Sequence, residues 1–250
     1  MIQVDVLGGL FRDFLFYGNV HATEVLEMMG GTGYNVHVGL RSVGIETVIH
    51  AAGGYDNPLH EGLSIDNERT GIFVCRNETE PLAVYRGANL MMQVEPLVSN
   101  ILFATLECGG DIFEAYARNM KQKGGFVVLD PTPSFEWREK WLDWCDVLIP
   151  NEKELERIGK DVVRRKPVYL KQGIHGGSYR YDDQQYACPA QKEGSFPLGC
   201  GDAFDVAVVY GYLHHYSPQD ILSLAVRAGE RASFVQGSSK AVMEAVQAVI

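Results

Sequence analysis

The sequence predicts an α/β protein with a doubly wound, mainly parallel sheet and a small separate β-sheet. Short apolar runs alternate with segments of helical periodicity, which is typical of a parallel sheet covered by helices on both faces. Two stretches interrupt this alternation and have the pattern of β-hairpins instead. Neither an internal repeat nor a low-complexity linker divides the 250 residues, so we expect a single domain over residues 1–250.

Six short apolar runs are expected to form the strands of the main sheet. They are bounded by polar or glycine-containing segments, as strands buried on both faces usually are. These strands are expected at residues 2–7, 47–51, 101–104, 126–129, 147–149 and 168–170. Hairpins are expected at 72–85 and at 179–188, because turn residues separate two strand patterns in each.

Amphipathic patterns between the strands predict helices. The spacing of Val36 and Leu40 predicts a helix that ends at Gly44. The three tryptophans between residues 137 and 144 fall on one face of another expected helix. Residues 217–220, Ser-Pro-Gln-Asp, predict a helix start, with an N-cap, a proline at the first position and an acidic third residue.

The composition argues against several classes of function. The formal net charge is −10, whereas a nucleic-acid-binding face needs clustered basic residues, so we expect no nucleic-acid partner. The five cysteines are dispersed without metal-ligand spacing, which is typical of reduced thiols in a cytoplasmic protein. No apolar window is long enough to span a bilayer, and the first residues lack the pattern of a signal peptide. We therefore expect a cytoplasmic protein with no membrane partner.

The sharpest candidate site is the segment Gly199-Cys200-Gly201-Asp202, which opens an expected helix. Glycines let the backbone approach a ligand closely, and the free amides at a helix start attract negative charge. A carboxylate at the same place can accept a hydroxyl proton while those amides hold a developing anion. The alternative interpretation is an acidic residue in the first turn of a helix, with no further role.

A second candidate is Asn151 with Glu154, directly after the strand expected at 147–149. The carboxyl edge of an open parallel sheet is its usual ligand side, and oxygen atoms of these side chains could hold hydrated Mg²⁺. The alternative is a capping box, in which Asn151 caps a helix and Glu154 lies in its first turn. For this segment taken alone, the capping box is the favoured interpretation.

A third candidate is the glycine-rich segment 30–35 before the first expected helix. It does not match the dinucleotide-binding pattern, because Val36 stands where the third glycine of GxGxxG belongs. The phosphate-loop pattern GxxxxGKS/T and the metalloprotease pattern HExxH are absent from the sequence. A nicotinamide-dependent oxidoreductase is therefore disfavoured.

Together these segments resemble the ribokinase-like (PfkB) carbohydrate kinases, and the resemblance covers nearly the whole chain. Four motifs of the family occur in the family's order. They are similar to its N-terminal signature at residues 30–56, its NxxE motif at 151–154, its glycine turn at 171–176 and its GAGD signature at 199–202. The fold that this resemblance implies is a ribokinase-like α/β sheet with a β lid over the substrate.

The resemblance implies a role for each motif residue. Asp202 would deprotonate the acceptor hydroxyl, and the amides of Gly199, Cys200 and Gly201 would form an anion hole. The residues that would bind the substrate are Asp13, Gly31, Asn35 and Arg86. Gly173 and Gly176 would border the nucleotide, ATP, while Asn151 and Glu154 would organise Mg²⁺ through water.

Some features depart from the family pattern. The family usually has Asp-Thr before its GAGD motif, where this chain has Phe-Pro-Leu at 196–198; this argues against a monovalent-cation site, which borrows from that loop. Cys200 replaces the usual alanine. The lid, a hairpin inserted at about 70–89, is short for the family, so a second subunit could complete it in a homodimer.

The resemblance therefore implies transfer of the γ-phosphoryl group of ATP to a hydroxyl of a sugar or sugar-like molecule. Two alternatives remain open. The acceptor could be a nucleoside or a vitamin alcohol, because Phe11 and Tyr34 would suit a ring-bearing substrate. The chain could also be a catalytically silent ligand-binding homologue, which the lost Asp-Thr favours and the retained Asp202, Asn151 and Glu154 disfavour.

Overall fold

The main sheet has eight strands in the order β14-β13-β12-β11-β10-β9-β1-β4. The computed structural model describes residues 3–59 and 61–250, so Ile2 of the first expected strand lies outside the described residues. The strands are β1 (Gln3–Leu7), β4 (Glu46–His50), β9 (Ile101–Ala104), β10 (Phe126–Leu129), β11 (Val147–Leu148), β12 (Val168–Lys171), β13 (Gly177–Tyr181) and β14 (Gln184–Cys188). The strands from β12 to β4 pair in parallel, and the expected hairpin β13-β14 extends the sheet in antiparallel fashion. The doubly wound, mainly parallel sheet is thus confirmed.

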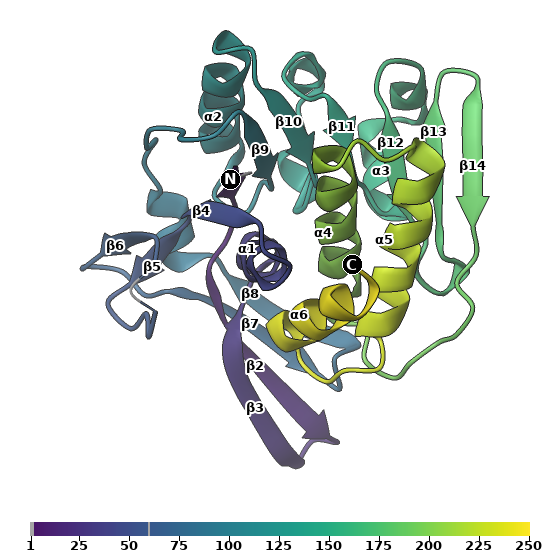
Figure 1. The fold of residues 1–250 in the computed structure, drawn as a ribbon. Helices are drawn as coiled ribbons and strands as arrows, with labels where there is room; N and C mark the ends of the chain where they lie inside the picture. The colour runs from purple at the N-terminus through teal and green to yellow at the C-terminus, as the bar shows by residue number, and fades with distance from the viewer. Residues whose placement is uncertain (1–2, 60) are drawn as a thin grey trace.

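Helices cover both faces of this sheet (Figure 1). One face carries α1 (Thr32–Ser42), α4 (Cys200–Leu213), α5 (Pro218–Ala232) and α6 (Ser238–Val249), and the other carries α2 (Gly110–Gln122) and α3 (Glu152–Ile158). Alternate strand residues enter the two cores: Val128 packs beneath the first group of helices, while Val127 and Leu129 pack beneath the second. No helix in the described part of the chain is long and apolar enough to cross a membrane.

The lid is a four-stranded sheet, which is larger than expected. Its strands are β2 (Phe11–Gly18), β3 (Ala22–Gly30), β7 (Gly71–Arg76) and β8 (Glu80–Tyr85), in the order β3-β2-β7-β8. The expected hairpin is β7-β8, and the hairpin β2-β3 joins it through parallel pairing of β2 with β7. The prediction of a short lid was therefore wrong. Strand β2 was overlooked because it has a buried Asp13 on one face and a half-exposed Phe14 on the other, against the usual alternation.

The Gly53-Gly54 and Asp56 part of the N-terminal signature lies at the base of the lid. Here β5 (Ala52–Gly54) pairs with β6 (Leu63–Ile65). The Asp56 carboxylate accepts hydrogen bonds from the Arg12 guanidinium of β2, at 3.0 Å, and from the Thr70 amide that precedes β7, at 2.8 Å. A side chain at Gly54 would overlap the backbone at Arg69, with a Cβ only 2.2 Å away. This motif therefore fastens both lid strands to the body.

The expected helix with three tryptophans does not form. The segment contains two short 3₁₀ turns, η2 (Ser134–Glu136) and η3 (Glu139–Asp143), and Trp137 between them is extended. Pro131 and Pro133 precede these turns and disfavour regular helix at this point. Trp141 is fully buried against Phe113, with ring centroids 5.3 Å apart.

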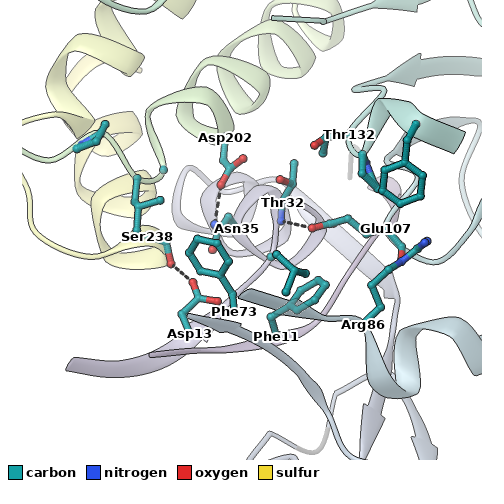
Figure 2. Close-up of a pocket in the computed structure, with 17 residues that line it drawn as sticks. Phe11, Asp13, Thr32, Asn35, Phe73, Arg86, Glu107, Thr132, Asp202 and Ser238 are labelled. Atoms are coloured by element: carbon teal, nitrogen blue, oxygen red, sulfur yellow. Dashed lines mark hydrogen bonds between the residues drawn. The ribbon is translucent and has the colours of Figure 1, made fainter. Parts of the chain in front are cut away.

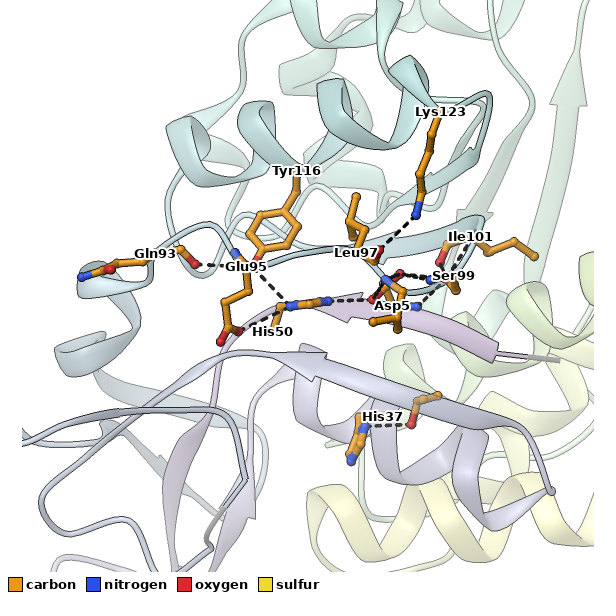
Figure 3. Close-up of polar contacts among 12 residues, drawn as sticks. Asp5, His37, His50, Gln93, Glu95, Leu97, Ser99, Ile101, Tyr116 and Lys123 are labelled. Atoms are coloured by element: carbon orange, nitrogen blue, oxygen red, sulfur yellow. Dashed lines mark hydrogen bonds and ion pairs between the residues drawn. The ribbon is translucent and has the colours of Figure 1, made fainter. Parts of the chain in front are cut away.

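A buried polar network fixes the segment that returns from the lid to β9 (Figure 3). Asp5 of β1 is 2.7 Å from the Nε2 atom of His50, and the amide and hydroxyl of Ser99 both donate to the Asp5 carboxylate at 2.8 Å. The Tyr116 hydroxyl contacts the other His50 nitrogen at 3.2 Å and accepts from the Glu95 amide at 2.9 Å. Although burial raises it, bonds with His50 and Ser99 leave the pKa of Asp5 below its ordinary value.

Candidate active site

Two cavities open at the carboxyl edge of the main sheet and meet at Asp202. The first, here called the lid cavity, has a volume of about 480 Å³ and is walled by the lid strands β2, β7 and β8. The second, here called the turn cavity, has a volume of about 440 Å³ and lies beside the turn between β12 and β13. The residues that line both cavities are Thr32, Thr132, Pro197 and Asp202. Ligands in the two cavities would therefore approach each other at the Asp202 carboxylate.

Asp202 lies in the first turn of α4, after Gly199, whose φ of 79° is left-handed and favours glycine. The Asn35 amide of α1 donates to the Asp202 carboxylate at 2.6 Å (Figure 2). Burial raises the pKa of Asp202, and the Asn35 hydrogen bond and the positive charge of Lys171 oppose that rise. A carboxylate held in this way can accept a proton from a hydroxyl in the lid cavity.

The amides predicted to form an anion hole stand at the start of α4. The first amides of a helix have no preceding turn to bond to, and the helix dipole makes them attractive to anions. The Cys200 amide is partly used, because it donates to the Pro197 carbonyl at 3.4 Å. Gly201 has room above its Cα, since an added Cβ would meet nothing nearer than 3.6 Å. Burial raises the pKa of the Cys200 thiol to about 12, so this side chain is neutral.

On the other side of Asp202, the lid cavity contains two buried oxygen atoms that lack partners. Asp13 Oδ2 accepts from the Ser238 hydroxyl at 2.7 Å, but Asp13 Oδ1 and Asn35 Oδ1 accept no hydrogen bond from the described residues. Figure 2 shows Asn35 next to Asp202, and Asp13 farther from it, next to Ser238. Gly31, with a φ of 97°, also lines this cavity. This position favours glycine, because a side chain there would overlap Phe11 and the Gly9 carbonyl. Unpaired buried acceptors require donors, and ligand hydroxyls are suitable ones.

Glu107 also lines the lid cavity, and the sequence analysis missed it. Its carboxylate accepts from the amides of Gly9, Thr32 and Gly33 at 2.7, 3.0 and 3.1 Å. It therefore caps the start of α1. Burial raises its pKa, and these backbone hydrogen bonds oppose the rise. The signal was available, because Glu107 closely follows the strand β9 at the sheet's ligand edge.

Arg86, a predicted substrate-binding residue, lines the lid cavity, and its guanidinium makes several contacts with the protein. It donates to the Glu107 carbonyl and the Leu106 carbonyl, each at 2.8 Å, and pairs with the Glu136 carboxylate at 2.9 Å. It also lies over the Phe135 ring, 5.8 Å from the centroid. These contacts fasten the end of β8 to the body. They use three of the five guanidinium N–H groups, which leaves two for the predicted role in substrate binding.

Gly173 and Gly176 border the turn cavity. They flank the 3₁₀ turn η5 (Gly173–His175) between β12 and β13, and their φ angles are 56° and 87°. Glycine adopts such angles most readily, and a Cβ on Gly176 would lie 2.1 Å from the Cys188 carbonyl oxygen. These glycines therefore shape the rim of the turn cavity.

Asn151 and Glu154 form the capping box that was the alternative interpretation. The Asn151 side chain accepts from the Glu154 amide at 3.0 Å, and the Glu154 carboxylate accepts from the Asn151 amide at 2.8 Å. Both residues also line the turn cavity. Burial, followed by the charge of Asp130, raises the pKa of Glu154 to about 7. The cap and a role at the cavity are therefore compatible.

A buried charge cluster at the floor of the turn cavity was not predicted. The Lys171 ammonium, at the end of β12, is 2.7 Å from Asp130 and 3.2 Å from both oxygens of Asp205. Both carboxylates are buried. The two charges outweigh the effect of burial and raise the pKa of Lys171, so the ammonium is charged. The sequence places Asp130 and Lys171 directly at strand ends, but only the fold shows that they meet.

Similar solved structures are kinases, although the sequences are only distantly similar. No protein-family model and no curated protein matches this sequence. The ribokinase of Thermotoga maritima superposes with a TM-score of 0.84 at 19% identity, covering 100% of this chain and 99% of that one. An Arabidopsis thaliana ribokinase complexed with ribose and ATP has a TM-score of 0.81 at 19% sequence identity, covering 99% of this chain and 98% of that one. A Burkholderia thailandensis nucleoside kinase in complex with inosine has a TM-score of 0.83 at 15% sequence identity, covering 98% of this chain and 96% of that one. The ribokinase-like fold implied by the sequence motifs is therefore confirmed.

The folded wild-type protein should lose stability as pH rises because of Asp13, and replacing Asp13 with asparagine should remove that loss. Burial raises the pKa of folded Asp13 to about 7, whereas its ordinary value is 3.8, so the unfolded chain loses this proton first as pH rises. The contribution of Asp13 to stability therefore falls between about pH 4 and pH 7, by up to about 4 kcal/mol. Urea unfolding at pH 5 and pH 8 should show that Asp13→Asn gains stability relative to wild type at the higher pH.

Asp183→Asn, at an exposed turn, is the matched control and should leave the difference between pH 5 and pH 8 unchanged. If wild type and Asp13→Asn differ by the same free energy at both values of pH, Asp13 is not the buried titrating group described above.

Proposed function

We propose that this chain is a small-molecule kinase of the ribokinase-like (PfkB) family, which transfers the γ-phosphoryl group of ATP to a hydroxyl of a sugar or sugar-like molecule. The observation that supports this most strongly is the meeting of two cavities at one carboxylate, Asp202, at the start of α4. Related folds occur in a ribokinase complexed with ribose and ATP. The acceptor would occupy the lid cavity and ATP the turn cavity.

In the proposed reaction, the acceptor hydroxyl oxygen forms a bond to the γ-phosphorus, and its proton passes to the Asp202 carboxylate. The bond between the γ-phosphorus and the bridging oxygen breaks, and its electron pair leaves with ADP. The amides of Gly199 and Gly201 would stabilise the charge of the transferred group, because they lie at the positive end of α4. Asp13 and Asn35 would accept bonds from other acceptor hydroxyls and so orient the reacting one.

The residues of the turn cavity fit a requirement for Mg²⁺. Mg²⁺ usually takes one or two carboxylates, phosphate oxygens and several waters, and in kinases it neutralises phosphate charge. Glu154 and Asp130 both line this cavity, and their mutual repulsion, which contributes to the raised pKa of Glu154, would be relieved by a cation. Asn151 would act through the cap that holds Glu154 in place. The described residues contain no cluster of three or more protein ligands, so phosphate and water would complete the coordination.

A nucleoside is the second candidate acceptor. The lid cavity is walled by several apolar side chains, which a sugar alone would not cover: Phe11, Phe73, Val84, Phe135 and Leu198. An aromatic base could pack against them, and a fold of this type binds inosine in a bacterial nucleoside kinase. Initial rates with ATP across sugars, polyols, vitamin alcohols and nucleosides distinguish these acceptor classes. Absence of transfer to every one of them would favour a silent binding protein.

The loop before Gly199 argues against a monovalent-cation site. The carbonyls that could bind a cation already accept hydrogen bonds: Phe196 from the Cys200 thiol and Pro197 from the Cys200 amide, both at 3.4 Å. The Ser233 carbonyl accepts from the Phe196 amide at 2.9 Å. Pro197 also fixes the backbone here. Cys200 and Ser233 therefore hold this loop in place.

The five free cysteines suit a cytoplasmic location.

The outer face of the lid suits pairing with a second copy of the chain. Alternate residues on the lid strands point away from the cavity and form an apolar surface: Phe14, Phe16, Val25, Ile72, Val74 and Tyr85. Val25 and Tyr85 are 56% and 47% exposed. The same face holds Arg12 and Glu27, whose opposite charges could pair across a twofold axis.

Asp202→Asn should abolish transfer while leaving the fold and ATP binding largely intact. Asparagine keeps the size of the side chain but cannot take the hydroxyl proton, so kcat should fall at least about 100-fold. Steady-state kinetics and calorimetric ATP titration check this. Asp220→Asn, at the start of α5, is the matched control and should keep normal turnover. Near-normal turnover by folded Asp202→Asn would remove the catalytic assignment.

Glu154→Gln should raise the magnesium concentration needed for half-maximal rate. Glutamine can still complete the capping box, so the change removes the charge and keeps the cap. Asn151→Ala tests the cap separately and should cost about 0.5–2 kcal/mol of stability. A magnesium titration of Glu154→Gln that superimposes on wild type would leave the cap as the only role of this residue.

Potassium should give weak activation or none, because the Phe196 and Pro197 carbonyls already accept hydrogen bonds from Cys200. Initial rates in potassium chloride and in the chloride of a bulky organic cation, at equal ionic strength, measure this. A several-fold increase specific to potassium would show that the loop opens to bind the ion.

Light scattering should give the mass of two chains for the wild type, because the outer lid face is apolar. Val25→Asp should give the mass of one chain, and Val20→Asp, in the β2-β3 turn, should not change the mass. A single-chain mass for the wild type at micromolar concentration rules out this pairing.

A further inference from the structure

Lys171 connects three elements beneath the turn cavity. It is the last residue of β12, and its side chain is only 13% exposed. Its ammonium lies 2.7 Å from Asp130, which follows β10, and 3.2 Å from Asp205, one turn after Asp202 in α4. The cluster therefore holds the start of α4 against the ends of two central strands.

The hydrogen-bonding capacity of the ammonium is not used up by these two partners. An ammonium has three N–H donors. Asp130 takes one, and the equal distances of 3.2 Å to both Asp205 oxygens are those of one donor shared by two acceptors. No other described side chain or carbonyl accepts from Lys171. One N–H is thus available, and the side chain lines the turn cavity.

The glycine at 201 keeps this side chain uncovered. A Cβ on Gly201 would lie 3.6 Å from Lys171 Cδ and 3.7 Å from its Nζ, which is ordinary contact and no clash. The ammonium therefore lies close to Gly201, whose amide would hold the transferred group. A methyl group at 201 would fit, and it would lie against the ammonium on the wall of the turn cavity.

The negative charge of the turn cavity also favours a cation at this position. The turn cavity is lined by the carboxyl groups of Asp130, Glu154 and Asp202, which would repel a phosphate chain. Lys171 is the largely buried cation on its wall, whereas Lys192 lies exposed at the rim. A resident positive charge offsets this repulsion at the end of the cavity next to Asp202.

We infer that Lys171 donates its free N–H to an oxygen of the terminal phosphate of the bound nucleotide, beside the Gly201 amide. The inference rests on the proposed function and adds a phosphate ligand to that site. Lysine is a common phosphate ligand, and a charge-assisted hydrogen bond of this kind changes affinity by about tenfold to a hundredfold. Lys171 would thus hold the group that is transferred, while its two carboxylates keep it in place.

The test compares calorimetric affinities for ATP and for adenosine, which lacks phosphate, with thermal unfolding measured in parallel. Gly201→Ala keeps the charge cluster and places a methyl group against the ammonium, so it should weaken ATP binding at least about tenfold and leave adenosine binding unchanged. Lys171→Met combined with Asp205→Asn, which limits the unpaired charge, should lower ATP affinity in the same way. Lys171→Arg should retain most of the ATP affinity, since arginine is also a cationic hydrogen-bond donor.

Asp205→Asn alone is the matched control, because it alters the cluster and keeps the ammonium; it should keep the preference for ATP over adenosine. Unchanged ATP affinity in Gly201→Ala, or ATP and adenosine weakening together in the Lys171→Met, Asp205→Asn double variant, would overturn the inference and leave Lys171 with a structural role. Failure of the proposed function would differ from both results, because wild type itself would then bind ATP no better than adenosine.

Discussion

The hydrogen bond of 2.6 Å between Asn35 and Asp202 joins the starts of α1 and α4, and the remaining parts of the site are arranged around it. Helix α1 can begin this close to the sheet edge because Gly8 and Gly33 touch backbone to backbone; a Cβ on Gly33 would lie 2.4 Å from Gly8 Cα. Glu107 then caps α1 from the end of β9. The lid cavity and the turn cavity meet at Asp202 as a consequence of this helix placement.

The site concentrates acidic side chains more than stability alone would favour. Burial raises the pKa values of five carboxyl groups at the site, and Lys171 is a largely buried cation beside them; the five are Asp13, Glu107, Glu154, Asp202 and Asp205. Burying carboxylates without full compensation destabilises a fold. Ligands would supply what is missing: hydroxyl donors for Asp13 in the lid cavity, and cations with phosphate in the turn cavity. Such an imbalance is expected at a site that binds polar ligands.

Much of this arrangement follows from the sequence for simple physical reasons. Strands buried on both faces are continuous apolar runs, so the strands of the main sheet were predicted near their observed positions. The glycine segments before Thr32 and Asp202 marked the two helix starts. The hairpin β2-β3 was not predicted, because Asp13 faces the core side, and the tryptophan segment was predicted as helix because its spacing fits one. The contacts of Lys171 with Asp130 and Asp205 could not be predicted, because they form only when segments far apart in sequence lie side by side.

The central claim is that an acceptor in the lid cavity and ATP in the turn cavity meet at Asp202. A crystal structure with a non-hydrolysable ATP analogue and an acceptor identified by rate measurements tests this most directly. The account predicts an acceptor hydroxyl within about 3 Å of the Asp202 carboxylate, facing the terminal phosphate above Gly201. An acceptor bound outside the lid cavity, or a phosphate chain that ends away from Asp202, would contradict it.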